Sequence, residues 1–186
     1  MQTLTDKEAM DWCKQWPLKF EFDSEGSLCP FTDGKAYRVD ISKMQWRDLL
    51  PTATSVAFLG SRTGELFCGG LVWIRRMGIT SPDWERVALR TLERFRMGYG
   101  ENRSIEVARA HLFRNDESSD VATVLLLAML AEWDTIFVPP SGDWVAFIGH
   151  NDHITVNAKS AEIAEDLRPS LETWGPTTST VPRTFY

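Results

Sequence analysis

The feature that most constrains the fold is an apolar helix predicted over residues 117–133. Ten residues between Val121 and Ala131 are apolar, so this helix has no polar face. Such a helix must be covered on all sides by protein or by lipid. Ten apolar residues are too few to cross a bilayer, which takes about 20. The sequence therefore predicts one fully buried helix that the rest of the chain covers.

Strands are predicted on both sides of this helix and in the first third of the chain. Alternating apolar and polar residues indicate strands with one buried face. Several of these runs are close enough in sequence to pair as hairpins, so a mostly antiparallel sheet is expected. The predicted strands cover 104–113 and 135–138, a hairpin with arms 144–149 and 154–158, a second pair over 18–22 and 37–41, and a third pair over 56–59 and 66–74.

Four further helices are predicted from capping residues and prolines. Thr5 begins a capping box, and Ser81 and Ser160 are favourable N-cap residues. Proline disfavours continuation of a helix, so Pro51 and Pro169 are expected to end helices. The predicted ranges are 5–15, 42–50, 82–97 and 161–167.

The chain of 186 residues fits one domain. Its composition, 43% hydrophobic and 25% charged, is that of a globular protein and excludes a disordered chain. We therefore predict a single α+β domain over residues 1–174, with helices packed on one face of a mostly antiparallel sheet. Residues 175–186 are rich in threonine and proline and are expected to form a flexible C-terminal tail.

The net charge of −6 is unevenly distributed. Residues 75–114 hold nine arginines and five acids, whereas residues 115–186 hold three basic and eleven acidic residues, a net charge of −8. Solvated faces explain this pattern, and so does an acidic surface presented to a basic partner. Arg86, Arg90 and Arg94 fall on one exposed side of a predicted helix. A nucleic-acid site would need more basic charge with interleaved aromatic residues, so no nucleic acid is expected.

Cysteine usage and the N-terminal residues indicate a reducing compartment. Cys13, Cys29 and Cys68 are odd in number and lack metal-ligand spacing, which suits free thiols. The first 16 residues contain acids and no apolar run, so they are not expected to form a signal peptide. The protein is therefore expected to be cytoplasmic, without a membrane partner.

The densest cluster of possible metal ligands is His150, Asp152 and His153, between the arms of the predicted hairpin. A metal would need a third ligand, either Asp152 or a distant residue such as His111. The same residues suit a hairpin turn, because Asn and Asp tolerate the left-handed conformation. The turn is the favoured interpretation, so neither a metal nor another cofactor is predicted.

Three other patterns could carry chemistry. Asp134 and Asp143 could form an acid–base pair, although aspartate is common at helix ends and turns. Cys68 could be a nucleophile with His111 as its base, although a buried structural thiol is the favoured interpretation. The adjacent glycines at 69–70 indicate a bulge or a close backbone approach, and no phosphate-loop spacing follows them. No catalytic residue is therefore assigned.

Two neighbouring segments carry a resemblance to a known family: WDTIFVP at 133–139 and GDWVAFIGHND at 142–152. They resemble the closing part of small bacterial immunity-like proteins encoded beside polymorphic toxins, in which Trp-Asp, a strand, a turn, a strand and Ser-His-Asp recur. Here Gly149 replaces the serine and Asn151 is inserted before Asp152. The resemblance spans about a tenth of the chain. It implies a cytosolic, non-enzymatic protein that binds and blocks a toxin, and it assigns no catalytic residue.

Two functional hypotheses follow. The first is a protein-binding domain, an immunity-type inhibitor of a bacterial toxin with a basic surface, which uses aromatic anchors among the eight tryptophans. Its predicted partner-binding residues lie in the C-terminal third: Asp143, Trp144, Asp152, Glu162, Glu165, Asp166 and Trp174. The second is a small enzyme or ligand-binding domain with a site near the predicted hairpin turn at residues 150–153. A bound metal or small molecule would favour the second, and a toxin encoded beside the gene would favour the first.

Overall fold

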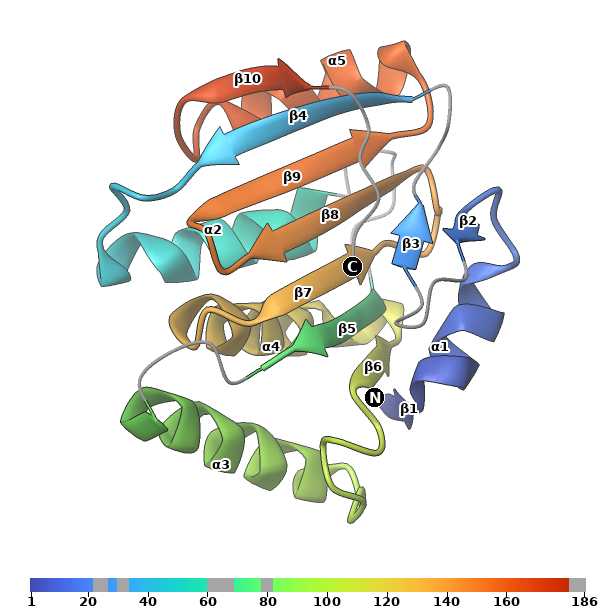
Figure 1. The fold of residues 1–186 in the computed structure, drawn as a ribbon, viewed down its shortest axis with the longest axis vertical. Coiled ribbons are helices and arrows are strands. Elements are labelled where there is room, and N and C mark those ends of the chain that lie inside the picture. The colour runs from blue at the N-terminus through green and yellow to red at the C-terminus, as the bar shows by residue number, and fades with distance from the viewer. Residues whose placement is uncertain (22–26, 30–33, 60–68, 78–81, 181–186) are drawn as a thin grey trace.

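The computed structural model describes residues 1–21, 27–29, 34–59, 69–77 and 82–180. Its strands are β1 (Gln2–Leu4), β2 (Lys19–Glu21), β3 (Ser27–Cys29), β4 (Lys35–Asp40), β5 (Gly70–Arg76), β6 (Ala110–Phe113), β7 (Asp134–Val138), β8 (Trp144–Gly149), β9 (His153–Ala158) and β10 (Thr177–Thr180). Eight of them form one sheet in the order β1-β6-β5-β7-β8-β9-β4-β10 (Figure 1). Each neighbouring pair in it is antiparallel, which confirms the predicted α+β class.

The helices are α1 (Asp6–Cys13), α2 (Trp46–Phe58), α3 (Pro82–Gly98), α4 (Ser118–Leu130) and α5 (Ala161–Leu171), with a short 3-10 helix, η2 (Asn115–Glu117), before α4. The capping box at Thr5 is confirmed, because the N–H of Glu8 donates to the Thr5 hydroxyl at 3.3 Å and the N–H of Thr5 donates to the Glu8 carboxylate at 2.7 Å. Ser160 caps α5 through the N–H of Ile163 at 3.3 Å, whereas Ser81 lies outside the described residues. None of the described helices combines the length and the hydrophobicity needed to cross a bilayer.

Helices cover both faces of the sheet. Side chains alternate between the faces along a strand. In β5, Val72 and Ile74 belong to a core cluster that includes residues of α2, α3, α4 and α5. Leu71 and Trp73 belong to a second cluster with Ala9 of α1. The prediction that helices cover only one face is therefore wrong, because α1 covers the other.

The helix α4 lies in the larger core cluster, as predicted, but it is not buried on every side. Leu125 and Ala128 have no exposed surface, and the helix packs between α2 and α3. Leu126 is half-buried, and Leu130 keeps 40% of its surface exposed. The sheet and the two neighbouring helices therefore leave one stripe of α4 at the surface.

Pro51 lies inside α2 and does not end it. A proline inside a helix removes a backbone hydrogen bond and costs about 3 kcal/mol. The residues beyond it compensate for this cost, since Ala53, Val56 and Ala57 are completely buried and α2 packs along α4. The prediction of a strand over 56–59 is therefore wrong.

The strand β4 pairs with distant parts of the chain. Tyr37 lies opposite Val156 of β9 on one side and Ser179 of β10 on the other. The predicted pairing of 18–22 with 37–41 is wrong, because β2 pairs with β3. Pairing with β9 places Tyr37 and Val39 in the larger core cluster with α5, where they are buried.

Two element boundaries near the centre of the chain differ from the predictions. The strand β6 is shorter than the predicted 104–113, since the N–H of Val107 donates to the carbonyl of Ser104 at 3.1 Å and forms a turn before it. The strand β5 begins at Gly70, and residues 60–68 of the predicted hairpin lie outside the described residues.

The C-terminal boundaries also differ. The helix α5 continues through Pro169 to Leu171, which is completely buried. Thr177–Thr180 of the predicted flexible tail form β10 and pair with β4. Residues 181–186 lie outside the described residues.

The glycines that begin β5 make the close backbone approach that their sequence predicted. A Cβ at Gly69 would lie 2.2 Å from the carbonyl oxygen of Phe113. Gly70 has a φ of +132°, and its Cβ would lie 2.6 Å from the carbonyl oxygen of Val138. These two positions let β5 enter between β6 and β7.

The helix α3 exposes the predicted row of arginines: Arg86, Arg90 and Arg94. Leu92 is completely buried on its opposite side. Val87 is 61% exposed, whereas Arg96 in the last turn is only 1% exposed. The last turn of α3 therefore carries a basic residue into the interior.

Candidate functional site

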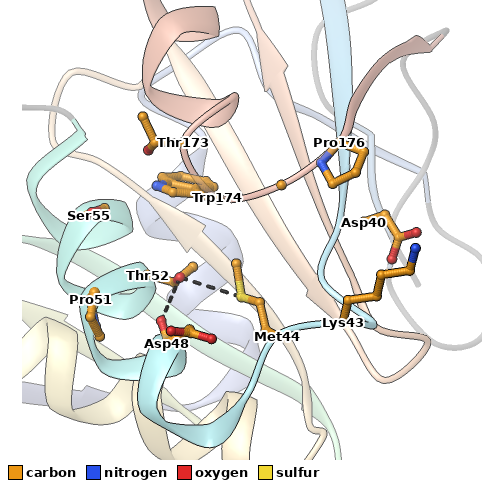
Figure 2. Close-up of a pocket in the computed structure, with 11 residues that line it drawn as sticks. Asp40, Lys43, Met44, Asp48, Pro51, Thr52, Ser55, Thr173, Trp174 and Pro176 are labelled. Carbon is orange, nitrogen blue, oxygen red and sulfur yellow. Dashed lines mark hydrogen bonds between the residues drawn. The ribbon is translucent and has the colours of Figure 1, made fainter.

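A cleft lies where α2, the end of β4 and the segment between α5 and β10 meet (Figure 2). Its volume is about 400 Å³. Ligand sites typically have volumes of about 300–1,000 Å³, so the cleft is large enough to hold a ligand or a side chain of a partner. Figure 2 shows that one wall comes from α2 and the facing wall from the residues after α5 and after β4.

Trp174 forms the aromatic part of the cleft. It follows α5, and its backbone N–H donates to the carbonyl of Leu171 at 3.0 Å, so the end of the helix fixes its position. Its side chain is only 6% exposed, and its indole N–H has no hydrogen-bond partner among the described residues. At the next position, Gly175, a Cβ would lie 2.5 Å from the carbonyl oxygen of Asp40. The backbone after Trp174 therefore passes directly against the end of β4.

Two carboxylates stand at the rim of the cleft. Asp40 accepts a hydrogen bond from the N–H of Ser42 at 2.9 Å. The hydroxyl and the N–H of Ser42, and then the charge of Lys43, lower the pKa of Asp40. Asp48 lies in the first turn of α2 and accepts from the N–H of Gln45 at 3.0 Å, where the helix dipole favours its negative charge. Among the described residues of the lining, Lys43 is the single cation beside these two carboxylates.

Thr52 supplies a buried hydroxyl group to the cleft. Thr52 is 4% exposed, and its hydroxyl donates to the carbonyl of Asp48 at 2.8 Å (Figure 2). Thr52 also contacts the sulfur of Met44 at 3.5 Å, so its hydroxyl is held within the wall of the cleft. Trp174 and Thr52 form a buried floor under the charged rim.

The predicted hairpin turn is held by hydrogen bonds that its residues make to β7 and to one another. The N–H and the ring Nδ1 of His150 contact Oδ1 of Asp134 at 3.0 and 2.8 Å. The ring Nδ1 of His153 contacts the carbonyl of Asn151 at 3.2 Å, and burial lowers the pKa of His153. Asp152 has a φ of 53°, the left-handed conformation predicted for the turn. Within the described ranges, no group of three histidine, cysteine, aspartate or glutamate side chains could hold a metal.

This turn lies beside the cleft. The N–H of Ile41, the residue after Asp40, donates to the carbonyl of Asp152 at 2.9 Å. Asp40 itself lies opposite His153 in the ladder between β4 and β9. The exposed Asp152 therefore adds its charge to the rim that Asp40 begins.

Asp143 lies at the opposite end of the hairpin. It forms an ion pair with Lys159 at 3.6 Å. The pairing of β7 with β8 places Asp134 beside Gly149, so the length of β8, about 20 Å, separates Asp134 from Asp143. The predicted acid–base pair of Asp134 and Asp143 is therefore not formed.

Glu162, Glu165 and Asp166 are exposed on α5, as predicted. Glu165 forms an ion pair with Lys35 and accepts from the hydroxyl of Tyr37 at 2.8 Å. These two contacts, the Lys35 contact first, lower the pKa of Glu165. The neutralising partner of Glu165 comes from a distant part of the sequence, because β4 packs beside α5.

Two further predicted candidates lie in the interior. Trp144 is 2% exposed and packs edge-on against Phe137, with ring centroids 5.5 Å apart, so it cannot serve as a surface anchor. His111 is completely buried, and burial and then the charge of Arg96 lower its pKa to about 3. Cys68, its proposed nucleophilic partner, lies outside the described residues.

Trp174 is the one residue of the described cleft lining that was predicted from the sequence, and the charged residues Asp40, Lys43 and Asp48 were not predicted. The spacing of Gln45 and Asp48 is a visible capping signal, but it indicates a helix start and not a site. The pairing of β4 with β10 brings residues 40–55 against residues 173–176, which are far apart in the sequence. No local pattern could have joined them.

Comparisons of the chain with protein-family models, curated proteins and solved structures gave no match.

Proposed function

We propose that the protein binds and neutralises a basic protein, as an immunity-type inhibitor of a bacterial toxin does, and that the cleft makes the contact. The cleft carries this proposal, since Trp174 and Thr52 are buried at its base while Asp40 and Asp48 stand exposed at its rim. Protein interfaces commonly combine a buried aromatic anchor with a polar rim. The resemblance of residues 133–152 to immunity-like proteins supports the same class of function.

The rim suits a partner of opposite charge. Asp40, Asp48 and Asp152 lie at one corner of the molecule, and Lys43 is the single cation that the described residues add to the cleft lining. Such a rim raises the rate of association more than the final affinity, and salt weakens it. At physiological ionic strength charges are screened beyond about 8 Å, so these carboxylates act mainly on the residues that dock beside them.

The test uses a basic protein partner, obtained by co-purification or from a toxin domain encoded next to the gene, and two matched charge reversals. Asp40→Lys with Asp152→Lys alters the rim. Glu162→Lys with Asp166→Lys alters α5 by the same number of charges and serves as the control. Asp48 is left unchanged because it caps α2. Association rates are measured at about 0.05 M and about 0.5 M salt.

We expect the rim variant to associate about tenfold more slowly than the wild type at low salt and to approach it at high salt. The α5 variant should change less. Wild-type rates for the rim variant would contradict the proposal. So would the absence of any protein partner together with turnover of a small molecule, which would instead favour a site near residues 150–153.

A further inference from the structure

We infer that an extended segment of the basic partner adds to the outer edge of β10 as a further strand of the sheet, an inference that rests on the proposed function. The order of the eight strands ends with β10, and Figure 1 shows it at the rim of the sheet, with β4 on its inner side. The outer N–H and C=O groups of an edge strand can pair with another chain. Strand addition of this kind is a recurrent way of recognising an extended peptide.

One hydrogen bond fixes which backbone groups of β10 face outward. The N–H of Asp40 donates to the carbonyl of Pro176 at 3.1 Å, so Pro176 directs its carbonyl towards β4. Alternate residues of a strand direct their backbone groups to opposite sides, so Thr178 also bonds to β4, and Thr177 and Ser179 present theirs outward. On this outer side, no residue in the described part of the chain donates to or accepts from these N–H and C=O groups.

The other edge of the sheet is closed by a side chain. Nη2 of Arg103 donates to the carbonyl of Thr3 and to its hydroxyl, both at 3.0 Å. Thr3 is the central residue of β1 and is only 7% exposed. Charged residues, proline and bulges commonly protect an edge strand. The strand β10 contains only threonine and serine, and its register with β4 has no shift. In the described chain, one edge is therefore blocked and the other is open.

The start of β10 connects this edge to the cleft. Gly175 and Pro176, which precede β10, line the cleft together with Asp40. A strand rises about 3.3 Å per residue, so a segment of about four residues paired with β10 extends from Ser179 to the rim. Backbone pairing gives no charge selectivity, whereas the carboxylates of Asp40 and Asp48 favour a cation at that end. The segment that fits is therefore an uncharged, β-forming run with lysine or arginine at its cleft end.

The experiment follows the backbone N–H signals of β10 by NMR in the isotope-labelled full chain. The probe is the peptide acetyl-Lys-Thr-Val-Thr-Val-Lys-amide, which presents a cation at the cleft end in either strand direction. One control peptide carries glutamate at both ends. A second control carries a methyl group on each central backbone nitrogen, so its central residues cannot donate to β10.

Three variants test the protein side of the contact. Ser179→Pro removes one outward N–H and leaves the N–H groups that bond to β4. Ser179→Val keeps this outward N–H and is the matched control, since valine favours strands. Asp40→Asn removes a rim charge while keeping an acceptor for the N–H of Ser42. Slow hydrogen exchange at Thr178 in both Ser179 variants shows that β10 still pairs with β4, and the methylated peptide tests the edge without any substitution.

We expect the lysine peptide to shift the signals of Thr177 and Ser179 saturably and to slow the exchange of their N–H hydrogens. The glutamate peptide should bind at least about fivefold more weakly at low salt, and the methylated peptide should cause no shift. Ser179→Pro should weaken binding by about fivefold or more, and Ser179→Val should leave it unchanged. Asp40→Asn should reduce the preference for the lysine peptide by at least about twofold.

Four results would overturn the inference. They are no shift with the lysine peptide, equal binding of the methylated or the glutamate peptide, unchanged binding in Ser179→Pro, and an unchanged lysine preference in Asp40→Asn.

The two proposals can fail separately. If a basic protein binds at rates that depend on the rim and binds Ser179→Pro as tightly as the wild type, the strand addition is wrong and the binding function stands. If the lysine peptide adds to β10 and no basic protein partner exists, the binding function is wrong and β10 remains a peptide site.

Discussion

Replacing Leu125 by alanine is expected to destabilise the protein strongly. Leu125 has no exposed surface and belongs to the larger core cluster, where α4 packs between α2 and α3. Truncation of a buried leucine costs about 2–5 kcal/mol, depending on how far the neighbours can close the cavity. Helices on both sides and the sheet restrict that closure, so we expect about 3 kcal/mol. The matched control is Leu130→Ala on the same helix, where 40% exposure reduces the expected cost to about 1 kcal/mol.

Thermal unfolding followed by circular dichroism distinguishes the two variants. In a domain of this length, each kcal/mol shifts the Tm by about 2–4 °C. Leu125→Ala should therefore lower the Tm by about 6–12 °C and Leu130→Ala by no more than about 4 °C. Equal decreases in the two variants, or a Leu125→Ala protein that melts within about 2 °C of the wild type, would refute the assignment of α4 as the central core helix.

Two further predictions concern backbone strain and a buried histidine. Gly70→Ala should cost about 2–4 kcal/mol, because its φ is +132° and the new methyl group would meet the carbonyl of Val138. The control, Gly98→Ala, places its methyl group in open space and should stabilise the protein by about 0.4–1 kcal/mol. Equal midpoints of urea unfolding for the two variants would contradict this prediction. Burial, and then the charge of Arg96, lower the pKa of His111 from 6.5 to about 3 in the folded state. The unfolded state therefore binds the proton first as the pH falls. The free energy of unfolding should decrease as the pH falls from about 6.5 towards 3. In His111→Phe the slope over this range should shrink by up to about 1.4 kcal/mol per pH unit, and an unchanged slope would show that His111 does not contribute.

Elements specified by neighbouring residues could be predicted from the sequence. The capping box at Thr5 depends on residues three positions apart, and both of its hydrogen bonds form. The turn around Asp152 depends on residues that tolerate a positive φ, and Asp152 adopts one. The apolar run of α4 required extensive cover, and most of that helix is covered. In these cases the deciding interactions lie within one turn or one run of the chain.

The same local reasoning failed where distant contacts outweighed a local preference. Pro51 disfavours a helix, yet the burial of Ala53, Val56 and Ala57 against α4 carries α2 past it. The strand β4 was expected to pair with a neighbour in sequence and pairs instead with β9 and β10. The alternation of apolar and polar residues shows which face of a strand is buried. It does not show which strand lies beside it, because neighbouring strands pair through backbone groups along their edges.

The candidate site also contains some residues that the sequence predicted and others that only the fold brings together. The sequence by itself predicted Asp152 and Trp174 as partner-binding residues, because charge and aromatic content are visible in the chain. Only the tertiary structure decided that Trp174 is buried in a cleft and that Asp40 and Asp48 form its rim. It also placed Trp144 in the core and paired Glu165 with Lys35. The physical reason is that exposure and ion pairing depend on which surfaces meet, and here they meet through the pairing of β4 with β9 and β10, which no local pattern specifies.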